Sequence, residues 1–187
     1  MRLFTAINLP DEMIWKLERL LSVLRPEALI KWSPLDNLHI TTKFIGEWPA
    51  DRVPEIENIL LELLPRQPFS IELRELGWFP NERSPRVLWA GVHASTDLTE
   101  LAHATEQCLS RLGIPAEGRP FAPHLTLARI KNPVPLNALR AKVQELQPAA
   151  MGSFEVKEFH LFRSDPGSHA SIYRKLQAFQ FQQAMVA

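Results

Sequence analysis

Two short stretches of the chain carry residue types suited to acid–base chemistry. They read LHITTKF from residue 38 and PHLTLAR from residue 123, and each holds a His followed two positions later by a Thr. Their β-branched and aliphatic residues predict strands. Because side chains alternate between the faces of a strand, His39 and Thr41 share one face, as do His124 and Thr126. Each stretch therefore presents an imidazole beside a hydroxyl.

The bare spacing is not specific, because five of the six histidines have Ser or Thr two positions on. His103 lies among apolar residues at helical spacing, where side chains two apart diverge by ~200° and cannot act as a pair. His169 follows a Pro-Gly-Ser turn signal. His93 ends an apolar run, and we expect a hydrogen-bonded structural residue there. Two matching strand motifs, one in each half of the chain, favour a shared site.

Two histidines suit general acid–base catalysis without a covalent intermediate. An imidazole has an unperturbed pKa of about 6.5, so both protonation states are available near neutral pH. One ring can take a proton from water while the other donates to a departing oxygen, each step contributing ~10²–10⁴ in rate. The threonine hydroxyls would donate to non-bridging phosphate oxygens. This chemistry suits a cyclic phosphodiester, whose leaving oxygen is already fixed in place.

Signatures of other chemistries are missing from the sequence. It has no His-Glu-x-x-His, no paired cysteines, no glycine-rich phosphate loop and no Gly-x-Ser-x-Gly elbow. We therefore expect neither a metal nor another cofactor. The single cysteine, Cys108, falls on the apolar face of a predicted helix, so we expect a buried structural thiol rather than a nucleophile.

Length and composition indicate one domain, residues 1–187, with one or two lobes. The 21 basic and 21 acidic residues give zero formal charge, which argues against a large surface for duplex nucleic acid but allows a small anion or an RNA end. The apolar start is too short for a signal peptide, and no run of ~18 apolar residues offers a membrane span. We expect a cytoplasmic protein that does not bind membranes.

Hydrophobic periodicity predicts an α+β fold of two similar lobes, with both histidine strands facing a central cleft. The predicted strands are 2–7, 29–32, the first motif, 69–76, 87–92, the second motif, 154–162 and 171–181, and the predicted helices are 11–24, 55–64, 97–112 and 136–146. Residues 77–85 are expected to form a hairpin loop. Asp97 and Glu100 predict a capping box, and Gly113 predicts a helix stop.

Longer motifs extend the pattern beyond the two histidines. They are RLFTAINLP from residue 2, Trp32, NLHITTKFIGE from 37, GWFP from 77, PRVLWAGV from 85 and RPFAPHLTLAR from 119. With these motifs the chain, from residue 2 to about residue 180, closely resembles the bacterial RNA 2',3'-cyclic phosphodiesterases. These proteins are also called 2'-5' RNA ligases and belong to the two-histidine phosphoesterase superfamily.

The resemblance implies a bilobal, pseudo-symmetric fold with antiparallel sheets. It implies hydrolysis of RNA 2',3'-cyclic phosphate ends to 2'-phosphates without a metal or cofactor. We further expect a monomer that needs no protein partner. Matched by motif, His39 and His124 are catalytic, and Thr41, Thr126 and Arg129 bind the phosphate. Because the leaving group would be O3', we assign His39 as its acid and His124 as the base that activates water.

Residues next to the motifs raise further expectations. Arg129 is five positions beyond the second histidine, so strict alternation places it on the wrong face unless a bulge or a long reach corrects this. Lys43 shares parity with His39, so it either attracts the anion or is a solvated strand residue. For Phe44 and Phe121 we expect burial in the core rather than stacking on a base.

Other functions stay open at this stage. A ligase would join the cyclic phosphate end to a 5'-hydroxyl end, although zero net charge argues mildly against an enzyme that holds two RNA strands. A narrower phosphodiesterase would act on small cyclic nucleotides or a cyclic phosphate of ADP-ribose. A non-catalytic nucleotide-binding module would not require two titrating groups, so the two intact pairs argue against it.

Overall fold

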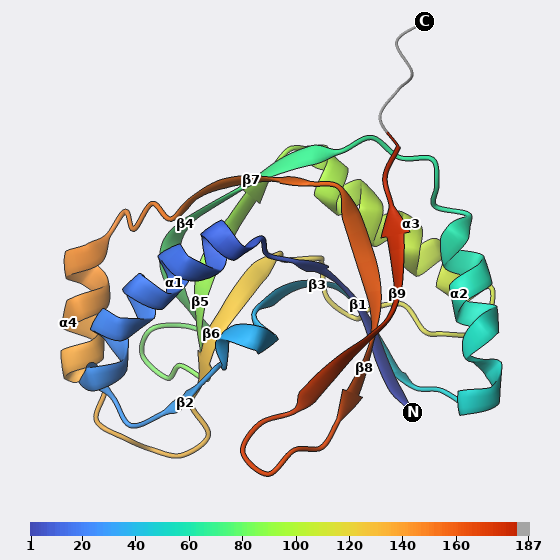
Figure 1. The fold of residues 1–187 in the computed structure, drawn as a ribbon. Helices are drawn as coiled ribbons and strands as arrows, with labels where there is room; N and C mark the ends of the chain where they lie inside the picture. Colours follow the sequence, from blue (N-terminus) through green and yellow to red (C-terminus); the bar gives the residue numbers. More distant parts are fainter. Residues whose placement is uncertain (183–187) are drawn as a thin grey trace, which may run out of the picture.

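The computed structural model describes residues 1–182 and contains two antiparallel sheets (Figure 1). The strands are β1 (Arg2–Asn8), β2 (Lys31–Trp32), β3 (His39–Glu47), β4 (Phe69–Phe79), β5 (Val87–Ala94), β6 (His124–Arg129), β7 (Gly152–Val156), β8 (Glu158–Asp165) and β9 (Ile172–Gln180). The α-helices are α1 (Asp11–Leu24), α2 (Val53–Leu61), α3 (Thr96–Ser110) and α4 (Asn137–Leu146). Short 3₁₀ turns cover Arg25–Glu27, Leu35–Asn37 and Ala50–Arg52. The α+β prediction is confirmed.

Each sheet contains one of the two motif strands. The four-stranded sheet has the order β3-β1-β8-β9, and the five-stranded sheet has the order β2-β6-β5-β4-β7. Helix α1 follows β1 but packs against β7 and α4, whereas α3 follows β5 but packs against β3 and α2. Each of these two helices therefore packs against the sheet that does not contain the strand before it. The two sheets with their helices form two lobes, which lie side by side in Figure 1.

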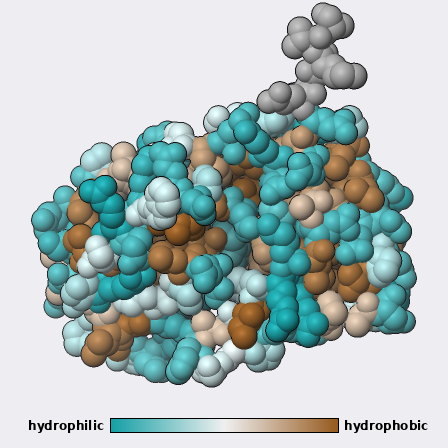
Figure 2. Space-filling view, viewed as in Figure 1, coloured by the Kyte–Doolittle hydropathy of each residue, from teal (hydrophilic) through white to brown (hydrophobic). Residues whose placement is uncertain are grey.

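The helices are held by apolar stripes that the sheets bury. In α1, Met13, Leu17, Leu21 and Leu24 recur at helical spacing and are buried, while Asp11 begins the helix where its dipole favours an acid. Buried apolar residues from both sheets belong to one continuous cluster. On the face seen in Figure 2, hydrophilic and hydrophobic side chains are interspersed. Within residues 1–182, no helix is long and apolar enough to cross a membrane.

The strand predicted over 154–162 is two strands in different sheets. Strand β7 pairs with β4 in the five-stranded sheet, and β8 pairs with β1 in the four-stranded sheet. Lys157 alone separates them. The prediction was wrong because it read one strand through a break in the pattern. Val156 and then Phe159 are buried, so alternation is interrupted at Lys157 and Glu158, where the chain leaves one sheet and enters the other.

Other predicted boundaries shift by a few residues. Strand β4 continues to Phe79, so the first part of the expected loop is strand, and β2 is shorter than predicted. The capping box is wrong: α3 begins at Thr96, and the Asp97 carboxylate accepts a hydrogen bond from the Ser95 hydroxyl instead of a backbone N–H. Gly113 has a φ of +82°, as expected for a helix stop.

Candidate active site

The two motif strands contribute to one cleft of about 660 Å³ between the lobes. The cleft is lined by all five residues assigned from the motifs, namely His39, Thr41, His124, Thr126 and Arg129. Strand β3 lies at the edge of its sheet, close to β6. A second hollow of about 510 Å³, beside α1 and residues 146–152, contains none of them.

His39 is oriented by hydrogen bonds at both ring nitrogens. Its Nδ1 lies 2.6 Å from the carbonyl oxygen of Asn37, which only accepts, so Nδ1 carries the proton. In the neutral ring Nε2 is then an acceptor, and the Thr41 hydroxyl 3.0 Å away donates to it. The atom available for proton exchange is therefore Nε2.

His124 repeats half of this arrangement. Its Nδ1 donates to the carbonyl oxygen of Ala122 at 2.9 Å, again two residues before the histidine. The same tautomer results, with Nε2 as the exchanging atom. The ring packs edge-on against Phe79, with centroids 5.0 Å apart. Both strand starts therefore fix their imidazoles through the backbone of the preceding loop.

The environment of His39 is more enclosed and more apolar. The rings of Phe4 and Tyr173 lie 5.0 and 5.1 Å from its centroid. This burial lowers the pKa of His39, and the positive charges of Arg129 and His124 act in the same direction, while the bond to the Asn37 carbonyl opposes them. These surroundings therefore favour neutral His39 in the free enzyme.

A β-bulge turns Arg129 into the cleft. In the pairing of β5 with β6, Leu88 is opposite Ala128 and Trp89 is opposite Thr126, which leaves Leu127 as the extra residue. Leu127 and Ala128 are both buried, so alternation resumes one residue late. Arg129 consequently lies on the same side as His124, and the bulge required by the sequence argument is present.

The first motif strand has a bulge at the matching position. Thr5 pairs with Lys43 and Ala6 pairs with Thr41, so Thr42 is the extra residue. Thr42 is buried, and its hydroxyl lies 2.7 Å from that of Thr5, which satisfies both groups. The bulge moves the side chains that follow it to the opposite faces from those that strict alternation predicts.

Lys43 therefore points away from the cleft, and both expectations, that it attracts the anion or that it is a solvated strand residue, are wrong. It is 3% exposed. Its Nζ contacts Glu106 Oε2 at 3.1 Å, the Pro115 carbonyl at 2.9 Å and Glu117 Oε1 at 3.3 Å. The hydrogen bond from the Glu117 backbone N–H is the main cause that lowers the pKa of Glu106, and Lys43 adds to it. The lysine ties β3 to α3 and to the loop before β6.

Phe44 lies in the cleft instead, so its expected burial is also wrong. It is 56% exposed and lines the cavity. Phe121, by contrast, is half-buried and packs against the core. Phe44 stands five residues after His39, as Arg129 stands five residues after His124.

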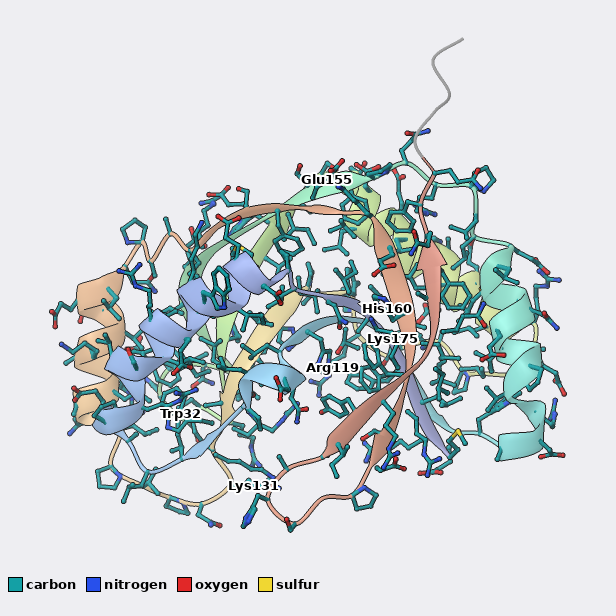
Figure 3. The ribbon with its side chains drawn as sticks, viewed as in Figure 1. Trp32, Arg119, Lys131, Glu155, His160 and Lys175 are labelled. Carbon is teal, nitrogen blue, oxygen red and sulfur yellow. The ribbon has the colours of Figure 1, made fainter. Side chains whose placement is uncertain are left out.

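The other histidines lie outside the cleft lining. His93 Nε2 is 3.3 Å from Glu75 Oε2, which fits the expected structural role, and His103 is exposed on α3. His160 is buried on β8, with its Nε2 3.0 Å from Glu158 Oε1. Burial is the main cause that lowers the pKa of His160, and the positive charge of Lys175 acts in the same direction (Figure 3).

Cys108 is buried, as predicted for a structural thiol. Burial raises its pKa to about 11, so the thiol stays protonated near neutral pH. In the part of the chain that the structure describes, no group of three or more His, Cys, Asp or Glu side chains could hold a metal ion.

Sequence reasoning missed several residues of the cleft. Tyr173 comes from β9, far along the chain from either motif, and no local pattern marks it. Lys31 and Lys131 also line the cleft. The pairing of β2 with β6 places Lys31 opposite Arg129 and so identifies it as a neighbour of the motif, whereas Lys131 follows Arg129 by two residues in the sequence.

An α+β fold that presents a His-x-Thr strand from each lobe to one cleft defines the class of the protein, the two-histidine enzymes. The model of the 2'-5' RNA ligase superfamily matches residues 10–168. The chain belongs to this superfamily and is an enzyme.

Individual relatives agree over almost the whole chain. A protein of Archaeoglobus fulgidus named RNA 2',3'-cyclic phosphodiesterase is 34% identical over 180 residues, 96% of this chain and 100% of that protein. The crystal structure of TT0787 of Thermus thermophilus matches with a TM-score of 0.84 and 32% identity, covering 98% of this chain and 100% of that one. E. coli LigT complexed with 3'-AMP gives 0.78 and 27%, covering 97% and 98%. The resemblance thus extends to archaea and is not confined to bacterial proteins.

Proposed function

We propose that the enzyme hydrolyses RNA 2',3'-cyclic phosphate ends to 2'-phosphate ends by acid–base catalysis with His39 and His124. The observation that supports this most is that both imidazoles are held through Nδ1, so that Nε2 is the exchanging atom in each, in one cleft with two Thr and an Arg. Relatives over most of the chain carry the name RNA 2',3'-cyclic phosphodiesterase.

The proposed reaction proceeds by one displacement. Water attacks the phosphorus while Nε2 of His124 takes its proton, and the P–O3' bond breaks while Nε2–H of His39 gives a proton to O3'. The hydroxyls of Thr41 and Thr126 and the guanidinium of Arg129 hold the non-bridging oxygens, where charge develops. Proton exchange with solvent then restores both histidines.

The lowered pKa of His39 bears directly on its role as the acid. In the free enzyme, burial and the charge of Arg129 disfavour the imidazolium. A bound phosphate monoanion brings a negative charge next to the ring and offsets the cation, which favours protonation. His39 therefore acts as the acid only when substrate is bound, whereas the less enclosed His124 is accessible to the attacking water.

A change of leaving group tests these roles. A phosphodiester that releases 4-nitrophenolate needs no proton at the leaving oxygen. We expect His39→Ala to lose much less activity on this diester than on a 2',3'-cyclic phosphate, and His124→Ala to lose similar activity on both. If instead His124→Ala were the variant that loses less activity on this diester, His124 would be the acid and His39 the base.

The activity itself is tested with a short RNA that ends in a 2',3'-cyclic phosphate, incubated with the enzyme in EDTA. We expect a mass gain of one water and a 2'-phosphate, distinguished from a 3'-phosphate by analysis of the product. A 3'-phosphate would contradict O3' as the leaving group. Loss of activity in EDTA that a divalent ion restores would contradict metal-independent catalysis.

The superfamily match supports ligation as a second candidate activity. In ligation, the 5'-hydroxyl of another RNA would replace water as the nucleophile at the same phosphate. Adding an RNA with a 5'-hydroxyl end and measuring the joined product against the hydrolysed one compares the two reactions. We expect hydrolysis to dominate, because water is the more abundant nucleophile.

The proposal includes a cytoplasmic enzyme that acts as a monomer without a protein partner. The support for a monomer is that both motif strands of the cleft come from one chain. Light scattering during size-exclusion chromatography would test it, with a mass near 21.4 kDa as the expected result.

A further inference from the structure

Two further cations of the cleft lining lie next to Arg129. Lys31 is paired directly opposite Arg129 in the short β2–β6 ladder, so the two side chains lie on the same face. Lys131 follows two residues after Arg129 and also lines the cleft. Figure 3 shows Lys131 in the loop after β6, toward the tip of the β8–β9 hairpin.

These cations are not neutralised within the described part of the chain. Neither Lys31, Arg129 nor Lys131 forms an ion pair there, and no Asp or Glu lines the cleft. Other cations of the chain do form ion pairs, as the buried Lys43 does. Like charges placed directly opposite on paired strands destabilise a sheet, so this arrangement indicates a site for anionic groups.

One phosphate does not satisfy all three cations. In the proposed reaction the phosphate lies between the two histidines, where Arg129 also lines the cleft. Residues opposite each other across a ladder have Cβ atoms ~5 Å apart, and two residues along an extended chain span ~6.6 Å. Lys31 and Lys131 therefore extend the positive charge beyond the reacting group.

We propose that Lys31 and Lys131 form a second anion subsite that binds the phosphate on the 5' side of the terminal nucleotide. This rests on the proposed function and makes it narrower. The preferred substrate is then an RNA end with at least one upstream phosphate, rather than a nucleoside 2',3'-cyclic phosphate alone. The two lysines contact the backbone only, so the preference is independent of the base.

The test compares adenosine 2',3'-cyclic phosphate with and without a 5'-phosphate, and the dinucleotide that ends in the same cyclic phosphate. A charged hydrogen bond to one phosphate predicts an increase in kcat/KM of about tenfold or more for both substrates that carry the upstream phosphate. In the double variant Lys31→Met/Lys131→Met we expect this ratio to fall to near one. Added salt should lower the ratio in the wild type.

The matched control removes two lysines outside the cleft, Lys142→Met/Lys157→Met, and should keep the ratio. A ratio near one in the wild type, or a Lys31/Lys131 double variant that keeps the ratio, would overturn the second subsite while leaving the proposed function intact. Failure of the wild type to hydrolyse any of the three substrates would overturn the proposed function itself.

Discussion

The two motif strands use the same backbone arrangement with different side chains. In each, a histidine and the threonine two residues later face the cleft, a bulge follows that threonine, and the residue five positions after the histidine returns to the cleft. On β3 this residue is Phe44, and on β6 it is Arg129. The bulge therefore determines which positions reach the cleft, while the residue types make the lobes different.

The two strands therefore differ in what they contribute: the second supplies a charge for the phosphate, and the first supplies apolar surface that encloses the site. Arg129 supplies a permanent positive charge, whereas Phe44 supplies an apolar surface that is 56% exposed. The aromatic rings of Phe4 and Tyr173 surround His39, but His124 has only Phe79 as a close aromatic neighbour in the described part of the chain. Two histidines with the same tautomer thus occupy different environments, as separate acid and base roles require.

Removal of either imidazole should have the largest effect. We expect His39→Ala and His124→Ala each to lower kcat on the cyclic phosphate by ~10²–10⁴, because each removes one proton transfer. His103→Ala, on the exposed side of α3, is the control and should retain activity. Equal losses in all three variants, measured by product formation, would contradict the site assignment.

Substitution of Arg129 and of Phe44, the cleft residues that follow the two bulges, should have the next largest effects, and these effects should be unequal. Arg129→Met should lower kcat/KM by ~10²–10³, because it removes a charged group from the phosphate. Phe44→Ala should change kcat/KM by less than about tenfold, because it removes only apolar contact. Steady-state kinetics of both variants on one cyclic phosphate measures the two losses of kcat/KM. Equal losses would show that the two positions contribute alike and would contradict the expected difference.

Regular periodicity explains what could be predicted from the sequence. The apolar stripe of α1 and the alternation in both motif strands are local patterns, so α1 matches its predicted bounds, and the motif pairs lie where alternation places them. The five assigned site residues could be named because each falls within these motifs, and the structure places them in one cleft.

Bulges and long-range pairing explain what could not be predicted. The bulge at Thr42 changes the parity of the strand without any distinctive residue, so Lys43 and Phe44 were assigned to the wrong faces. Tyr173 reaches the cleft only because β9 pairs with β8, a contact that no local pattern encodes. The sequence pattern therefore cannot predict the face of a side chain where a strand departs from strict alternation, nor a cleft residue supplied by a distant strand.

Loss of the buried lysine should have a moderate effect on stability. Lys43 follows the bulge residue Thr42 and is buried, and Ala128 is the buried residue at the same position of the second strand. Only the first strand therefore buries a charge that needs ion-pair partners there. Breaking a buried pair costs ~3–5 kcal/mol, and because Glu106 and Glu117 are partly exposed we expect Lys43→Met to lower the free energy of unfolding by ~1–3 kcal/mol. Urea unfolding measures this, with the exposed Lys157→Met as the control. A change within ~0.5 kcal/mol would show that the contacts do not stabilise the fold.

The pH dependence of stability should show the smallest effect and should report the enclosed environment of His39. Burial lowers the pKa of His39 in the folded enzyme, whereas in the unfolded chain it returns to about 6.5. Below about pH 6.5 the unfolded chain therefore binds a proton that the folded chain does not, so stability is present above this pH and is lost as the pH falls toward the lowered pKa.

His39→Asn should make this loss of stability shallower, seen as a smaller drop in Tm between pH 7 and 5. The pKa of the buried His160 is also lowered, so His160→Asn should make it shallower as well. Inorganic phosphate separates the contributions of His39 and His160, because the proposed phosphate site includes His39 but not His160, and a bound phosphate favours the His39 imidazolium. In the wild type and in His160→Asn, phosphate should therefore raise Tm more at pH 5.5 than at pH 7.5. The same enhancement in His39→Asn would show that His39 is not the group to which phosphate binding is coupled.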